Sequence, residues 1–121
     1  MKTYRYVAIK EMEIAGSHHL TLPYESKCTN VHGHNWIVKV HVGADKLNDN
    51  GMVLDFALIK KNIHNKLDHG NLNEIFDFNP TAENIAEWIA KEINVMATGI
   101  HCFKVEIYES KNNLAVFNDV E

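Results

Sequence analysis

The sequence contains few cysteines and no long apolar run. Its 121 residues include two cysteines, Cys28 and Cys102, and no apolar stretch approaches the ~20 residues of a membrane-spanning helix. The segment 1–6 carries no apolar stretch of the signal-peptide type. Two cysteines without such a signal favour free thiols in a cytoplasmic protein over a disulfide. Because repeats, low-complexity tracts and linkers are also absent from the sequence, we expect a single domain spanning residues 1–121.

The sequence also lacks an excess of positive charge. Its formal net charge is −4 with neutral histidines, and 23% of its residues are charged. This balance does not favour a nucleic-acid or membrane partner, and we expect neither. Histidine, in contrast, is abundant, with eight copies in the chain. Such a histidine content points to metal or proton chemistry.

The hydrophobic pattern predicts an α+β fold. Aromatic and β-branched residues with period-two alternation predict strands, and apolar stripes at helical spacing behind Asp55 and Thr81 predict helices that these residues cap. Residues 16–31, which include Pro23 and many polar side chains, are expected to form a loop. The predicted strands are 4–15, 32–42, 102–109 and 114–117, and the predicted helices are 55–67 and 81–93. This order, strand-strand-helix-helix-strand-strand, favours an antiparallel sheet with both helices on one face.

A sheet of this kind in so short a chain leaves one apolar face and two edges uncovered. Oligomerisation that joins the sheets of several chains into a barrel would cover both. We therefore expect an oligomeric barrel.

The segment from Cys28 to His34 is the strongest functional signal. In a strand, His32 and His34 point to the same face, and Gly33 between them allows a close approach of the backbone. With a third histidine delivered from the loop that carries His18 and His19, they would form a three-histidine zinc site with an open, catalytic position. Copper, nickel or iron are not excluded by the spacing. The alternative is a closed structural zinc site with Cys28 as the fourth ligand.

Cys28 is a candidate catalytic thiol. The neighbouring Lys27 and a nearby zinc ion would lower its pKa and populate the thiolate, which can act as a base or a nucleophile. The alternative is a small buried hydrophobic residue, a description that fits Cys102 in its apolar strand better.

Two further groups have a functional and an ordinary interpretation. Asp68 and His69 could form a proton-transfer pair, or they could simply end the first helix. Glu109 could bind a ligand, or it could be a solvated charge at the end of a strand. The other histidines are expected to be surface or packing residues: His41, His64 and His101.

Taken together, the motifs carry a family resemblance that covers essentially the whole chain. They are Gly16-Ser17-His18-His19-Leu20, Cys28-x3-His32-Gly33-His34-Asn35, Asp55-Phe56, Leu67-Asp68-His69-x2-Leu72-Asn73, Asn79-Pro80-Thr81-x-Glu83-Asn84 and Glu109-Ser110. This combination resembles the 6-pyruvoyl-tetrahydropterin synthase family. The resemblance implies a tunnelling fold (ββααββ) and a homohexamer, built of two stacked trimeric barrels with active sites at the subunit interfaces.

The resemblance also implies a role for each matching residue. It implies Zn²⁺ as the cofactor, with His18, His32 and His34 as its ligands. It implies Cys28, Asp68 and His69 as catalytic residues and Glu109 as the anchor of the pterin. Lys27 is the basic residue nearest to these motifs and is expected to contact the triphosphate of the substrate.

Within the family, the chain looks most like the compact bacterial branch that makes 6-carboxy-5,6,7,8-tetrahydropterin in queuosine biosynthesis. The implied activity is that of a zinc-dependent lyase that converts 7,8-dihydroneopterin triphosphate into this product, with release of triphosphate and acetaldehyde. The alternatives are a 6-pyruvoyl-tetrahydropterin synthase and a zinc-containing pterin-binding module without catalytic activity.

Overall fold

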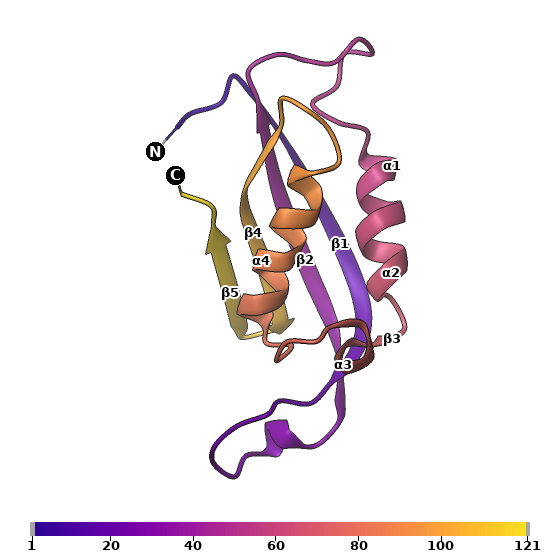
Figure 1. Cartoon of the computed structure of the whole chain (residues 1–121), viewed down its shortest axis with the longest axis vertical. Helices are drawn as coiled ribbons and strands as arrows, with labels where there is room; N and C mark the ends of the chain where they lie inside the picture. The colour runs from indigo at the N-terminus through magenta and orange to yellow at the C-terminus, as the bar shows by residue number, and fades with distance from the viewer. Residues whose placement is uncertain (1, 121) are drawn as a thin grey trace.

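The computed structural model describes residues 2–120 and is built on one five-stranded sheet with the order β3-β1-β2-β4-β5. Two long strands form its centre and pair antiparallel along their whole length (Figure 1). The strands are β1 (Tyr6–His18), β2 (His32–Ala44), β3 (Gly70–Asn71), β4 (His101–Ser110) and β5 (Asn113–Asn118). The predicted α+β class and the four predicted strands are confirmed.

The helices lie on one face of this sheet, with α4 in front of β2 and β4 and the α1–α2 helix beside β1 (Figure 1). Their bounds are α1 (Phe56–Ile59), a π-helical turn (Lys60–His64), α2 (Asn65–Leu67), α3 (Leu72–Ile75) and α4 (Ala82–Asn94). Asp55 and Thr81 cap α1 and α4 as predicted, since their side chains accept hydrogen bonds from Ala57 N and Asn84 N. No helix within the described part of the chain could span a bilayer.

The core lies between the helices and the sheet. Alternate residues of β2 turn toward the helices, and Trp36, Val38 and Val40 are buried there. The apolar stripes of the two main helices meet them. These stripes are Ile59, Ile63 and Leu67 on α1–α2, and Ile85, Ile89 and Ile93 on α4.

The sheet is mixed, so the prediction of a purely antiparallel sheet is wrong. After α2 the chain returns beside β1 and pairs parallel to it, Gly16 with Gly70 and Ser17 with Asn71. The backbone N–H of His69 begins this contact by donating to the carbonyl of Ala15 at 2.6 Å. So short a strand leaves no periodicity in the sequence.

The first strand is longer than predicted, because it continues through Gly16 and Ser17 to His18, which pairs with His32. Pairing with β2 on one side and β3 on the other compensates for the low strand propensity of glycine and serine. The prediction of a loop from residue 16 onward is therefore wrong for residues 16–18.

A register shift in β4 determines which side of the sheet Phe103 and Cys102 face. In a regular strand Phe103 would lie on the same side as Val105, but here the pairing with β2 passes from Lys104 to Cys102 across a bulge. Phe103 consequently stacks on Tyr4 on the other side of the sheet, while Cys102 is fully buried in the core. The sheet ends at β3 and β5, so a single chain does not close into a barrel.

Candidate metal centre and catalytic residues

Three histidines meet where β1 ends and β2 begins. His18 pairs with His32 in the strand register, and His34 lies one alternation further along β2. One ring nitrogen from each histidine lies within 4.8 Å of the other two. The predicted grouping of His18, His32 and His34 is thus present, although His18 is delivered by a strand and not by a loop. His19 is not a member of this group.

Two backbone carbonyls orient the rings. Nδ1 of His18 lies 2.8 Å from the carbonyl oxygen of Pro80, and Nδ1 of His32 lies 2.6 Å from that of Asn30. Because a carbonyl only accepts, each Nδ1 must carry the hydrogen and donate it. The tautomer thereby fixed leaves Nε2 with a free lone pair, which is the arrangement of a metal-ligating histidine.

The Nε2 atoms of His18 and His34 are buried and make no hydrogen bond within residues 2–120. A buried polar atom without a partner costs about 1–3 kcal/mol. Oε1 of Glu109 lies 3.5 Å from Nε2 of His34, but this contact lacks the geometry of a hydrogen bond. A cation held by the three rings would give both of these nitrogens a partner.

The electrostatics of the cluster favour neutral imidazoles. Burial lowers the pKa of His18, against the opposing effect of the Pro80 carbonyl. Burial also lowers the pKa of His34, and the Glu109 carboxylate opposes the shift. Since a metal binds only the neutral ring, these shifts keep the ligands available at physiological pH.

The donor set fits zinc with an open coordination position. Three imidazole nitrogens form the group, and the Cys28 thiol lies outside it. A closed structural site would need a fourth protein ligand. The geometry therefore disfavours the closed site in which Cys28 binds the metal.

Cys28 lies in a short 3-10 turn (Lys27–Thr29) within the loop that joins β1 to β2. Its backbone N–H donates to Oγ of Ser26 at 3.2 Å, and its carbonyl accepts from the N–H of Leu20 at 2.6 Å. The Cys28 side chain is half-buried and that of Lys27 is exposed. Both are accessible to a ligand.

Asp68 and His69 do face each other, with Oδ2 of Asp68 3.4 Å from Nε2 of His69. The other carboxylate oxygen accepts from the backbone N–H of Ala15 at 2.9 Å, and this hydrogen bond is the main cause of the lowered pKa of Asp68. The His69 side chain is 84% exposed. Its φ of 59° places a non-glycine residue in the left-handed region. A charged carboxylate beside an exposed imidazole is suited to moving protons.

The catalytic candidates are only partly brought together. His34 and His69 line the same surface cavity of about 370 Å³, together with Gly16 and Gly70. In contrast, no hydrogen bond or ion pair joins Cys28 to Asp68 or His69 in the described residues.

The remaining histidines lie outside the metal cluster, as predicted. Nε2 of His41 is 2.8 Å from Glu106 on the face of the sheet away from the helices. Nε2 of His101 is 2.8 Å from Asp119, and its Nδ1 contacts the Tyr4 hydroxyl. Both side chains are engaged in packing and ion pairs.

The fold and this cluster define a small α+β protein with a candidate three-histidine metal site at a strand junction. Comparison with known proteins gives the family: residues 8–119 match the family described as 6-pyruvoyl tetrahydropterin synthase. The chain belongs to this family, and the resemblance seen in the sequence is confirmed.

Curated relatives agree with this assignment, and a solved structure shows the same fold. The chain is 34% identical over 120 residues to the 6-carboxy-5,6,7,8-tetrahydropterin synthase of Synechocystis sp., covering 91% of each chain. It is 28% identical over 125 residues to the Bacillus subtilis protein of the same name, covering 94% of this chain and 86% of the relative. The structure of the Caenorhabditis elegans 6-pyruvoyl tetrahydropterin synthase superimposes with a TM-score of 0.73 at 24% identity, over 99% of this chain and 100% of the other.

Proposed function

We propose that the protein is a zinc-dependent lyase that converts 7,8-dihydroneopterin triphosphate and one water into 6-carboxy-5,6,7,8-tetrahydropterin, triphosphate and acetaldehyde, in queuosine biosynthesis. The observation that carries the proposal is the histidine cluster, in which two buried Nε2 atoms have no hydrogen-bond partner among residues 2–120 and could both bind a cation. The names of the Bacillus and Synechocystis relatives support the choice of reaction.

The residues of the chain divide the work. Zn²⁺ held by His18, His32 and His34 would supply Lewis acidity toward the side-chain hydroxyls of the substrate. Cys28, as the thiolate, removes a proton from the side-chain carbon. Asp68 holds His69 in the orientation needed to relay protons during the internal redox shift.

Binding of the substrate falls to two other residues. The Glu109 carboxylate pairs with two N–H donors at the edge of the pterin, a geometry that suits a carboxylate. The distance of 3.5 Å between Oε1 of Glu109 and Nε2 of His34 supports a role for Glu109 beside the histidine cluster. Lys27 is exposed on the same loop as Cys28 and contacts the triphosphate.

We further propose that the active form is a homohexamer of two trimeric barrels in the cytoplasm. The face of the sheet away from the helices exposes apolar side chains, namely Val7, Ile9, Tyr108, Leu114 and Val116. Exposed apolar surface of this extent, next to an open sheet edge at β5, favours association. Sedimentation that gives a stable species of 13.8 kDa would contradict the hexamer.

The decisive experiment for the reaction is to incubate the zinc-loaded protein with 7,8-dihydroneopterin triphosphate and identify the products. We expect 6-carboxy-5,6,7,8-tetrahydropterin with acetaldehyde in equal amount. A pyruvoyl product without acetaldehyde would assign the protein to the pyruvoyl synthases, the alternative within the same family. Binding of the substrate without turnover would leave a pterin-binding module.

A further inference from the structure

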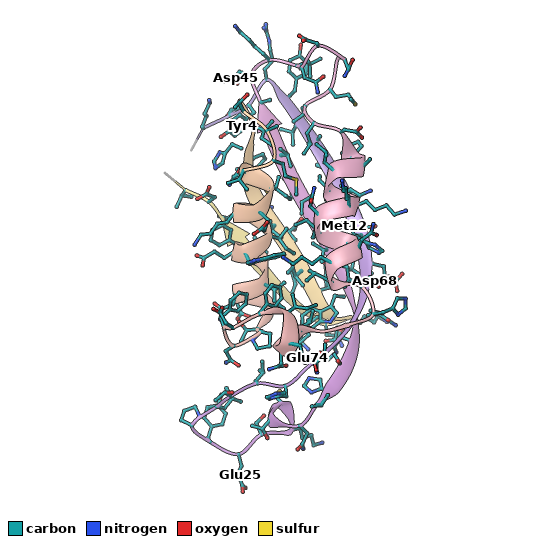
Figure 2. All side chains as sticks on the ribbon, turned by 45° about the vertical axis from the view of Figure 1, so that its right-hand side comes forward. Tyr4, Met12, Glu25, Asp45, Asp68 and Glu74 are labelled. Atoms are coloured by element: carbon teal, nitrogen blue, oxygen red, sulfur yellow. The ribbon has the colours of Figure 1, made fainter. Side chains whose placement is uncertain are left out.

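The loop that carries Cys28 leaves the body of the molecule. After His18 the chain turns away from the sheet and returns only at His32, and Figure 1 shows this segment projecting beyond α3. In Figure 2, Glu25 lies at its far end, away from Glu74 on α3. A projecting segment of this kind holds a catalytic thiol in place only if something fixes its base.

Asn73, on α3, holds the first residue of the loop. Its side-chain Oδ1 accepts from the backbone N–H of His19 at 2.8 Å, and its Nδ2 donates to the carbonyl of His19 at 3.0 Å. A side-chain amide presents one acceptor and one donor in the manner of a peptide group. The pair of hydrogen bonds therefore reproduces the two-bond unit of an antiparallel ladder.

Asn79 makes the same arrangement with Thr21. Its Oδ1 accepts from the Thr21 N–H at 2.9 Å, and its Nδ2 donates to the Thr21 carbonyl at 3.2 Å. Asn79 is itself braced, since its backbone carbonyl accepts from Nδ2 of Asn84 at 2.9 Å. Residues two apart in an extended segment present their backbone N–H and C=O groups to the same side. The side-chain amides of Asn73 and Asn79 therefore bind the same edge of the loop.

The residues next to these two contacts carry the chemistry. His18, immediately before His19, donates from Nδ1 to the carbonyl of Pro80, the residue after Asn79. Leu20, between the two paired residues, donates its N–H to the carbonyl of Cys28 at 2.6 Å. A displacement at the base of the loop would thus move both a metal ligand and the thiol.

We propose that Asn73 and Asn79 are positioning residues, which by pairing with His19 and Thr21 fix the His18 ligand and the Cys28 loop relative to each other. The metal part of this inference rests on the proposed function. The Asn73 pair is partly buried and the Asn79 pair is exposed. Because water replaces an exposed hydrogen bond more easily, changes at Asn73 have the larger effect.

The test compares alanine and aspartate at each position. Aspartate is the isostere of asparagine but cannot donate, so in Asn73→Asp a carboxylate oxygen faces the His19 carbonyl where an amide stood. We expect Asn73→Asp to loosen the base of the loop more than Asn73→Ala does. The Asn79 variants should follow the same order, with smaller effects. Asn62→Asp is the matched control, since Asn62 donates one amide hydrogen bond, to Leu58 O at 2.9 Å, on an exposed helix.

Two measurements distinguish an effect on the position of the loop from an effect on metal binding. The first is amide hydrogen exchange of Leu20, measured without metal, which we expect to become about tenfold faster in Asn73→Asp. The second is the rate at which a chelator in excess removes zinc from the loaded protein, which we expect to rise about tenfold, as for other groups that orient metal ligands. The Asn62 control should match the wild type in both.

Each outcome decides a different statement. An Asn73→Asp protein equal to the wild type in both readouts would overturn the inference. Faster exchange at Leu20 with unchanged zinc release would show that the amides hold the loop but do not position the metal ligand, and would also overturn it. A wild-type protein that takes up no zinc would refute the proposed function instead. The exchange measurement alone would then decide whether Asn73 and Asn79 hold the loop. If Asn73→Asp fails to fold, Asn79→Asp and Asn79→Ala are compared in the same two measurements, because the Asn79 pair is exposed.

Discussion

Zinc should stabilise this protein by an amount that depends on the histidine cluster. Without metal, the buried Nε2 atoms of His18 and His34 have no partner in the described chain, and binding a cation removes that penalty. Free zinc at about 100 times its dissociation constant adds about 2.7 kcal/mol to the free energy of unfolding. In a domain of this size 1 kcal/mol raises the melting temperature by about 4 °C, so we expect a rise of about 10 °C.

The assay is scanning calorimetry of the metal-free and zinc-loaded protein at about pH 7.5 and about pH 5. Burial lowers the pKa of His18 and His34 in the folded state. The unfolded chain, with histidine pKa values of about 6.5, therefore takes up protons first. The stability that these groups contribute is complete above about pH 6.5 and is lost as the pH falls toward their folded pKa values. The zinc-dependent rise should shrink over the same range, because protons compete for the rings.

Two variants make the result specific. His32→Ala should abolish the zinc-dependent rise, because two imidazoles remain. His41→Ala should keep it, since His41 lies on the other face of the sheet and pairs with Glu106. A rise of the same size in His32→Ala would mean that zinc binds elsewhere and would refute the reasoning.

Three further predictions concern the other candidate residues. Cys28→Ala should keep the fold and the zinc but lose turnover; loss of zinc on elemental analysis would make Cys28 a metal ligand. Glu109→Gln should lower kcat/KM through the loss of about 2–4 kcal/mol of transition-state stabilisation, while the melting temperature and zinc content stay unchanged. Wild-type kinetics would mean that another residue anchors the pterin. Iodoacetamide at about pH 8 should modify Cys28 and spare Cys102, because burial raises the pKa of the Cys102 thiol to about 12; mass spectrometry after proteolysis decides which thiol is alkylated.

Elements with a strong hydrophobic periodicity could be predicted from the sequence. Elements that depend on hydrogen bonds to distant residues, or that are too short to show a period, could not. The helix that became α4 was visible from its stripe, and its cap Thr81 was identified correctly. Strand β3 has two residues and α3 has four, too few for any periodicity to appear. The continuation of β1 to His18 depends on neighbours distant in sequence, which local propensity cannot reveal.

The candidate site divides in the same way. Alternation along the strand was sufficient to place His32 and His34 on one face, while the choice of His18 as the third histidine came from the family resemblance. Asn73 and Asn79 were visible only as members of motifs, without a role. Their partners lie 54 and 58 residues away in sequence, so their hydrogen bonds could be found only in the folded chain.

The backbone of His69 has a consequence for the relation between stability and activity. A non-glycine residue in the left-handed region costs about 1 kcal/mol, a strain that glycine would not carry. The side chain is also largely exposed, so its removal would sacrifice little packing. Glycine at this position would therefore make a more durable protein that lacks the proposed proton relay. A selection for heat resistance alone would be expected to remove His69, whereas a selection for catalysis would retain it at a thermodynamic disadvantage.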